Sequence, residues 1–428
     1  MASISAFKGL RYNDNFASKM NCFVSQPYDV IDDSMLAQYH QKSKYNITNL
    51  IQSKADDEYP NPYVKAMRIL DSWIKKGVLI QDSEPSIYIY RQQFQLENAQ
   101  NKSRFAFIAR GKIEDYSSGV IFPHEHTFQE LKIDRLNLLR HTQTNFGQIF
   151  MLYHDPNKRI NDFLTIQTNK SRPLYDFNFN GNDRHTFWKV SDPDFIQIII
   201  KEIADKQLII ADGHHRYEAA VMFRNEHPEI HNAKYRMMTF VNMADDGLII
   251  FPTHRLLRFS DMRIEYLLKQ IWEYFEVKEN ACDNTLELLT KMGQTAFKDN
   301  VFGFYAGNKR FYNLSPNQKL RDIIKKSLKP LSLQRLDVHI LHTFLEQLLK
   351  KEDCNNLKID YNIDANDAQV KIDSGNYHCA FYLNPTRIEQ IREVSLENEI
   401  MPQKSTYFYP KILTGLVFYQ LNNSRNFI

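Results

Sequence analysis

The segment that decides the fold prediction spans residues 207–220 and has the sequence QLIIADGHHRYEAA. Its apolar first half, from Leu208 to Ala211, predicts a short buried strand. A helix is predicted from about His214, and Gly213 allows the backbone to turn sharply and to approach a ligand closely. The free N–H groups of a first helical turn attract anions. The junction of strand and helix therefore predicts a compact anion site.

The polar side chains at this junction suit a phosphate group. Arg216 offers a planar pair of donors that matches phosphate oxygens. Asp212 precedes the predicted anion position, where a carboxylate can hold Mg²⁺ or accept the proton of a substrate hydroxyl. A purely structural interpretation is also open, in which Asp212 caps the helix and His214, His215 and Arg216 form a solvated first turn.

Upstream of the junction, the pattern predicts a mixture of helices and hairpins. Apolar residues at three- and four-residue spacing, with Pro62 near the start and Gly77 beyond the end, indicate an amphipathic helix. The Asn180-Gly181 step favours a tight hairpin turn. The predicted elements are a helix over 61–77, a hairpin of 86–94 with 104–114, a helix over 128–142, a strand over 148–153, a hairpin of 173–179 with 185–190 and a helix over 194–205.

Downstream, two strands are predicted over 234–243 and 247–259. Helices and strands then alternate to the C-terminus, with helices over 262–275, 284–296 and 336–350 and strands over 301–314, 357–363 and 377–384. This order predicts a mixed α+β protein. We expect a core domain built from segments of residues 1–260 and a C-terminal α/β domain over 261–428.

Composition narrows the classes of function. The 428 residues carry 54 Lys and Arg against 51 Asp and Glu, a formal net charge of +3 without long runs of one sign. Such a balance argues against a nucleic-acid partner or an acidic membrane surface. No apolar run approaches the roughly 20 residues that cross a bilayer, so no membrane partner is expected. The four cysteines form no CxxC pair, which indicates the reducing cytoplasm.

The sequence lacks the usual glycine-rich nucleotide motifs. It contains only 13 glycines, and neither GxxxxGK[ST] nor GxGxxG occurs. A P-loop or an ordinary Rossmann site is therefore not expected.

Two further groups of residues are candidates for a site. His124 and His126 flank Glu125, and with Asp212 and His214 they could bind a transition metal for hydrolysis or form hydrogen bonds to a ligand. Structural histidines are the alternative. Lys132 and Arg135, at the start of a predicted helix, are candidates for binding a phosphate; the alternative is a solvated helix face. The cluster Lys404, Ser405 and Thr406 could bind a second phosphate or a small carboxylate; the alternative is a turn or a helix cap.

The junction resembles a known motif. Its residues are similar to the Gly-x-His-Arg-x-x-Ala pattern of the ParB/sulfiredoxin superfamily, and Asp212 to Arg216 match the Asp-Gly-His-His-Arg motif of free serine kinases. Sulfiredoxins carry a reactive cysteine where this chain has His214, so reduction of a sulfinic acid is not expected.

The wider chain resembles the bacterial family known as domain of unknown function one thousand and fifteen, which is placed in the same superfamily. The matching segments are AFKGLRY (6–12), QPYDVI (26–31), FPHEHT (122–127), KIDRLNLLRHTQTN (132–145), IADGHHRYEAA (210–220), FPTHRLL (251–257) and MPQKSTYFYPKILTGLVFY (401–419). The resemblance implies a ParB/sulfiredoxin-like nucleotide-binding core.

The resemblance also implies a function. Gly213, His214, His215 and Arg216 would hold nucleotide phosphates, and ATP or ADP would bind with Mg²⁺ through Asp212. The expected activity is a kinase acting on the hydroxyl of a small metabolite, with free L-serine the leading candidate. Asp212 is the expected catalytic carboxylate, and the catalytic glutamate of the serine kinases has Asp29 or Glu125 as possible substitutes. The alternatives are a nucleotide-responsive binding protein without turnover and a metal-dependent hydrolase.

Overall fold

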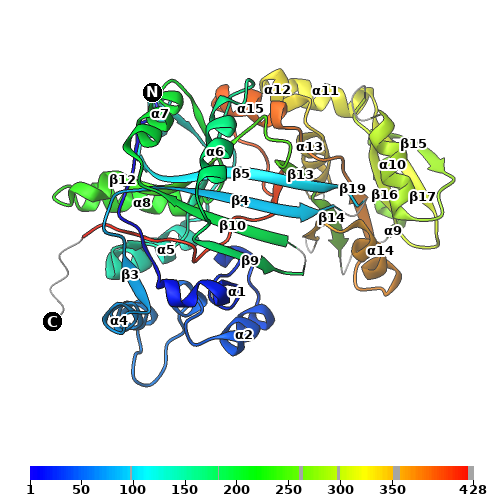
Figure 1. Ribbon diagram of the computed structural model, residues 1–428. Helices are drawn as coiled ribbons and strands as arrows, with labels where there is room; N and C mark the ends of the chain where they lie inside the picture. The colour runs from blue at the N-terminus through cyan, green and yellow to red at the C-terminus, as the bar shows by residue number, and fades with distance from the viewer. Residues whose placement is uncertain (97–98, 182, 260–263, 296–298, 350–356, 423–428) are drawn as a thin grey trace. The chain divides into compact units, whose positions relative to one another are not determined.

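The computed structural model describes residues 1–96, 99–181, 183–259, 264–295, 299–349 and 357–422. The chain forms two compact units. The first consists of Met1–Pro123, Thr127–Ile249 and Pro410–Ile428, and the second of His124–His126 and Ile250–Tyr409. Each unit contains helices and a sheet (Figure 1), so the predicted α+β class is confirmed. The ParB/sulfiredoxin-like character of the core stays a prediction.

The C-terminal segment belongs to the first unit, although the sequence places it in a domain over 261–428. The backbone of Leu10 donates to Phe418 O at 3.0 Å, and Ser25 N donates to Thr414 O at 3.0 Å. These long-range pairings have no local sequence signal. They bring Lys411 and Thr414 into the first unit, while the predicted boundary near residue 260 stays a prediction.

A nine-stranded mixed sheet forms the centre of the first unit, in the order β6-β11-β8-β12-β5-β4-β10-β9 with β1 added on β5. Strand β11 is parallel to β6 and antiparallel to β8, and β12 is parallel to β8. The strands are β1 (Ile4–Ser5), β4 (Ile87–Gln95), β5 (Asn101–Lys112), β6 (Ile121–Phe122), β8 (Ile149–Tyr153), β9 (Tyr175–Phe179), β10 (Asp183–Val190), β11 (Leu208–Asp212) and β12 (Tyr235–Asn242).

The helices of the first unit follow the predicted patterns. Asn61 caps α4 by accepting hydrogen bonds from Tyr63 N and Val64 N, Pro62 occupies the first turn, and Gly77 takes a φ of 68° beyond the end. Figure 1 shows α6 and α7 together on one side of β4, β5 and β10. The helices are α1 (Met20–Phe23), α2 (Asp33–Lys42), α3 (Thr48–Ile51), α4 (Pro62–Lys75), α5 (Gln129–Thr142), α6 (Arg159–Lys170), α7 (Pro193–Ile203) and α8 (His214–Glu226).

Both predicted hairpins are confirmed. Strand β4 pairs antiparallel with β5, with Ile89 opposite Phe107, and β9 pairs with β10. Asn180 and Gly181 have φ angles of 50° and 88°, the left-handed pair that a tight hairpin turn requires. These pairings set the register within each hairpin, and the long-range pairing of β10 with β4 joins the two hairpins.

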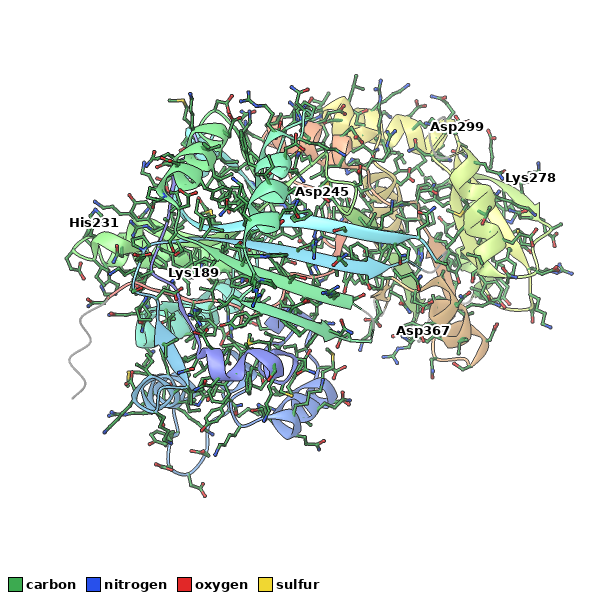
Figure 2. All side chains as sticks on the ribbon, viewed as in Figure 1. Lys189, His231, Asp245, Lys278, Asp299 and Asp367 are labelled. Atoms are coloured by element: carbon green, nitrogen blue, oxygen red, sulfur yellow. The ribbon has the colours of Figure 1, made fainter. Side chains whose placement is uncertain are left out.

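Buried charges tie separate segments of the first unit together. Asp82 is 3% exposed and accepts from Arg11 Nε at 2.9 Å, from Lys189 Nζ at 3.2 Å and from Tyr88 OH at 2.6 Å. Lys189 and Asp245 are labelled in Figure 2. Asp245 accepts from Asn161 Nδ2 at 2.7 Å, and burial raises the pKa of its carboxyl. Each buried carboxylate thus has donors that offset its desolvation.

The second unit is built on an antiparallel six-stranded sheet in the order β15-β17-β16-β19-β14-β18. The predicted strand over 301–314 is a hairpin, because Gly307, Asn308 and Lys309 have positive φ angles and form a turn. The strands are β14 (His254–Arg258), β15 (Phe275–Asn280), β16 (Phe302–Tyr305), β17 (Phe311–Pro316), β18 (Lys358–Asn362) and β19 (Cys379–Tyr382).

Seven helices of the second unit lie within the described residues, and a short sheet joins β13 (Ile249–Phe251) to β20 (Tyr407–Tyr409). No described helix of the chain is both long and apolar enough to cross a membrane. Cys22, Cys282 and Cys379 are free, and Cys354 lies outside the described residues. The helices are α9 (Ile264–Tyr274), α10 (Thr285–Thr295), α11 (Gln318–Lys326), α12 (Leu331–Gln334), α13 (Asp337–Leu349), α14 (Ala365–Asp373) and α15 (Ile388–Leu396).

Candidate functional site

The predicted strand, glycine and helix are present at residues 208–226. Strand β11 ends at Asp212 and α8 begins at His214. Gly213 has a φ of 98°, and no side chain of the described residues caps the helix at this position. A Cβ on Gly213 would lie 2.9 Å from Arg216 Nη2 and 3.2 Å from its Cζ. Glycine therefore permits both the left-handed turn and the folding of the Arg216 side chain back against the start of α8.

Gly213→Ala is expected to destabilise the fold by about 1–2 kcal/mol, because alanine is strained at this φ. It should also weaken the phosphate binding that the sequence predicts, since the added Cβ displaces the guanidinium of Arg216. Gly77→Ala is the matched control: its φ of 68° imposes similar strain, and no atom lies within 4 Å of the added Cβ. Urea unfolding and phosphate titration test both variants, and equal phosphate affinity in the two would contradict the role of Gly213.

Asp212 is held between two cations. Its Oδ1 accepts from Lys411 Nζ at 2.9 Å, and its Oδ2 accepts from Arg216 Nη2 at 2.6 Å. Burial alone would raise the pKa of this carboxyl, but the charges of Lys411 and Arg216 hold it well below its usual range. Asp212 is therefore an ionised carboxylate with both oxygens engaged, and its contacts position the two cations.

Three arginines, Arg135, Arg216 and Arg236, line a narrow pocket of ≈ 40 Å³ in the first unit. We call it the arginine pocket. Arg216 and Arg236 are only 8% and 6% exposed, and the Nε atom of each has no hydrogen-bond partner among the described residues. Besides the arginines, the lining includes Tyr28, Thr144, Phe146, Gly147, Ala219 and Thr414.

The charge in the arginine pocket is incompletely compensated. Arg236 Nη2 donates to Gly147 O at 3.0 Å, which is a neutral acceptor. Burial, together with the nearby charge of Arg216, lowers the pKa of Arg236 to about 9. A buried guanidinium with an open N–H donor is costly unless an anion binds to it. The pocket is therefore suited to an anion.

Arg135 and Tyr28 form one wall of the arginine pocket. The guanidinium of Arg135 lies 4.1 Å from the centre of the Tyr28 ring and donates to Ile51 O at 2.9 Å and to Asp134 Oδ2 at 2.7 Å. Burial raises the pKa of Tyr28 to about 12. Tyr28 is thus a neutral phenol at neutral pH, and it supplies an aromatic face that favours a cation.

The other predicted phosphate ligands of the junction have protein contacts. His215 Nε2 accepts from Phe128 N at 2.9 Å, and the two rings stack with 6.0 Å between centroids. His214 is 4% exposed. Lys132 pairs with Glu218 at 3.1 Å. Of the predicted cationic ligands, Arg216 and Arg135 line the arginine pocket, whereas Lys132 does not.

The candidates at residues 124–126 and 404–406 belong to the second unit, where their contacts connect two loops. His124 Nε2 lies 3.0 Å from Thr406 Oγ1, and Glu125 Oε1 accepts from Lys404 N at 3.2 Å. Ser405 Oγ donates to Pro402 O. These contacts favour the structural interpretation of the two segments, in which their polar groups hold a turn in place.

The structure does not place the predicted carboxylates at a metal centre. Asp29 is exposed beside Tyr28, and His126 is also exposed. Among the residues that the structure describes, no three His, Cys, Asp or Glu side chains are grouped so that they could hold a metal ion. The metal site of His124, His126, Asp212 and His214 stays a prediction, because its residues belong to two different units.

Sequence analysis missed Arg236, Lys411 and Tyr28 as site residues. Arg236 had a signal: it is a charged residue in the apolar run KYRMMTFVNM, where a strand buries nearly every side chain. Lys411 had none, because it lies 199 residues from the carboxylate that it pairs with.

The fold and the pocket define a mixed α+β protein with an arginine-lined pocket beside a helix start. Residues 4–339 match the family described as protein of unknown function (DUF1015), and the chain belongs to that family, which confirms the predicted membership. No curated protein matches the sequence.

The chain is also similar to several solved structures, but with low sequence identity and low TM-scores. A conserved hypothetical protein from Pyrococcus furiosus is 12% identical, with 71% of this chain and 92% of that chain covered and a TM-score of 0.36. A mutant free serine kinase in complex with AMP is 11% identical, with 69% and 89% covered and a TM-score of 0.36. SbnI with a C-terminal truncation, from Staphylococcus aureus, is 8% identical, with 70% and 83% covered and a TM-score of 0.35. Likenesses at this level do not say what this chain binds.

Proposed function

We propose that the chain binds nucleotide phosphate in the arginine pocket and transfers a phosphoryl group from ATP or ADP to the hydroxyl of a small metabolite. Free L-serine is the leading candidate, because residues 212–216 resemble the motif of free serine kinases. One observation carries the proposal: Arg216 and Arg236 are buried in the lining of one pocket, and the Nε of each has no hydrogen-bond partner among the described residues. Phosphate oxygens are strong acceptors for guanidinium groups.

The charge around Asp212 supports an anionic ligand. Arg216 and Lys411 both bind this single carboxylate, and Arg236 lies near Arg216 without a carboxylate of its own among the described contacts. Two cations thus share one carboxylate, and Arg236 adds a third positive charge nearby. A phosphate group would supply the missing negative charge, and the same donors would stabilise charge that develops on the transferred group.

Asp212 does not fit the predicted role of a Mg²⁺ ligand. Both of its oxygens are engaged by cations within 2.9 Å, and these cations would repel a divalent metal ion. We therefore assign Asp212 to positioning Arg216 and Lys411, and no step is routed through a metal at this carboxylate. Mg²⁺ remains part of the proposal only as a companion of the nucleotide.

A carboxylate that accepts the proton of the substrate hydroxyl stays a proposal. Asp29, next to the pocket residue Tyr28, is the candidate that lies in the first unit, and Glu125 is the candidate in the second. The lining of the arginine pocket contains no carboxylate within the described part of the chain. This observation favours the second candidate function, a protein that binds nucleotide as a signal without turning it over.

The first experiment is calorimetric titration with ATP, ADP and inorganic phosphate. Arg216→Ala is expected to weaken binding of all three by about a hundredfold, since it removes charge-assisted hydrogen bonds worth about 1.5–3 kcal/mol each. The control is Arg224→Ala in the same helix, because Arg224 pairs with the exposed Asp115 and should leave binding unchanged. Equal affinities in the wild type and Arg216→Ala would refute the proposed phosphate site.

A coupled assay with L-serine and other small alcohols then separates the two functions. Phosphorylation of L-serine with ATP or ADP supports the kinase. Tight nucleotide binding without turnover on the whole panel supports the binding protein.

A further inference from the structure

Two residues that line the arginine pocket, Tyr28 and Thr414, carry hydroxyl groups without a hydrogen-bond partner among the described residues. Unlike the Nε atoms of Arg216 and Arg236, neither Tyr28 OH nor Thr414 Oγ1 belongs to the enclosed side-chain atoms that lack a described partner. Both hydroxyls are therefore accessible to a ligand in the pocket, and the protein itself makes no described use of them.

The backbone of Thr414 fixes its position at the pocket. Thr414 N donates to Ser25 O at 2.9 Å, and Thr414 O accepts from Ser25 N at 3.0 Å. Because Ser25 lies three residues before Tyr28, this pairing also brings together the two segments that carry the hydroxyls. The Thr414 side chain takes no part in the pairing, so its hydroxyl is not needed to hold the C-terminal segment in place.

Gly147 leaves open a space beside the hydroxyl of Thr414. A Cβ on Gly147 would lie 2.8 Å from Arg216 Nη1 and 3.8 Å from Thr414 Oγ1, so these two atoms border the same space. Arg216 uses Nη2 to bind Asp212, and its Nη1 is neither enclosed nor paired with a described residue. A charged donor and a hydroxyl are thus available to one small ligand group.

Tyr28 supplies the second hydroxyl. The centre of its ring lies 4.1 Å from the guanidinium of Arg135 and 5.9 Å from that of Arg216. Burial raises the pKa of Tyr28 to about 12. The phenol therefore keeps its proton at neutral pH and can donate it in a hydrogen bond.

The size of the arginine pocket limits the group that it can hold. Its volume is ≈ 40 Å³, and one water molecule needs about 10–15 Å³ of such space. One tetrahedral oxyanion fits this space, and a chain of phosphates does not. A tetrahedral group directs its oxygens out of any single plane, whereas a planar carboxylate can be bound by one guanidinium through both of its oxygens.

We propose that Tyr28 and Thr414 are specificity-determining residues, whose hydroxyls bind oxygens of one terminal phosphoryl group and select it over a planar carboxylate. Arg216 supplies the charge, and the two hydroxyls supply donors outside the plane of its guanidinium. The inference rests on the proposed function for the presence of an anion in the pocket, and it adds the residues that recognise its shape.

The test is calorimetric titration with inorganic phosphate and with oxalate, a planar dianion. At about pH 8 phosphate is also mostly a dianion, so the two probes differ in shape rather than in charge. Tyr28→Phe and Thr414→Val are each expected to weaken phosphate binding about tenfold, because each removes one hydrogen bond to a charged group. The affinity for oxalate should stay unchanged in both variants.

The matched controls are Tyr382→Phe and Thr239→Val. They make the same chemical changes at hydroxyls that also lack a described partner, but neither residue lines the arginine pocket. Both controls should bind phosphate as the wild type does. Urea unfolding in phosphate-free buffer checks the fold: Tyr28→Phe and Thr414→Val should be as stable as the wild type or more stable, because no described hydrogen bond is lost.

The outcomes separate this inference from the proposed function. If Arg216→Ala weakens phosphate binding but Tyr28→Phe and Thr414→Val do not, the role of the hydroxyls is wrong and the phosphate site stands. Equal losses for phosphate and oxalate, or equal losses in the controls, would also overturn the selection of a phosphoryl group. If the wild type binds no phosphate, the proposed function and this inference both fail.

Discussion

Arg236→Met is expected to make the unliganded protein more stable while removing most of its affinity for phosphate. Arg236 is 6% exposed, its Nε has no described partner, and its Nη2 donates to the neutral carbonyl of Gly147. Burial and the nearby charge of Arg216 both disfavour the charge on Arg236 and lower its pKa. Methionine keeps an unbranched chain without a charge to desolvate, and replacing buried ionic groups by apolar ones gains about 1–4 kcal/mol in favourable cases.

Urea unfolding in phosphate-free buffer measures the expected gain, and calorimetry measures a loss of phosphate affinity of about a hundredfold. Arg110→Met is the control, because Arg110 also lies on a strand of the same sheet but donates to Ser5, Asn232 and Tyr419. That variant should lose stability. If Arg236→Met instead destabilises the protein and binds phosphate normally, Arg236 is a structural residue and the arginine pocket is not an anion site.

A gain in stability with a loss of binding is the behaviour expected of a functional residue. Sites that bind a charged ligand keep charges that the empty protein does not need. The same reasoning does not apply to Asp82, whose buried charge is met by Arg11 and Lys189 within 3.2 Å. Arg236 has an N–H donor without a described partner, whereas the charge of Asp82 is paired. This unpaired donor is what indicates a ligand.

Local pattern was sufficient to predict most elements of the first unit. The helix that starts at Pro62, the tight turn at Asn180-Gly181 and the junction at Gly213 all depend on residues a few positions apart. Neighbouring residues set backbone conformation through caps, spacing and glycine, and these effects are visible in a single sequence. The hairpin within 301–314 was missed because its turn residues, such as Asn308, were read as part of one strand.

The site could be predicted only in part, because its chemistry depends on distant segments. The sequence indicated Arg216 and Arg135, but it gave Asp212 the role of a metal ligand or base. That interpretation lacked Lys411, which the C-terminal segment brings to 2.9 Å from the carboxylate. A partner 199 residues away leaves no spacing pattern, yet it decides whether the carboxylate is free.

Asp212→Asn is expected to lower the free energy of unfolding by about 3–5 kcal/mol at neutral pH, the range for breaking a buried ion pair. The variant removes the negative charge that Arg216 and Lys411 share, and it leaves two neighbouring cations without an anion. Asp115→Asn is the control, since its pair with Arg224 is exposed and should be worth less than about 1 kcal/mol. Urea unfolding of the three proteins gives both values.

The pH dependence of the free energy of unfolding tests the same role of Asp212 independently. The pKa of Asp212 is lower in the folded protein than its ordinary value of 3.8, so the unfolded chain takes up the proton first as the pH falls. The contribution of Asp212 is therefore complete above about pH 5 and disappears as the pH falls through the folded-state pKa. The stability difference between wild type and Asp212→Asn should therefore shrink in acid. At neutral pH, inorganic phosphate should recover part of the lost stability, because it restores negative charge beside Arg216. A difference that is independent of pH would mean that the asparagine side chain disturbs packing alone, and the shared ion pair would then not be the reason that Asp212 occupies this position.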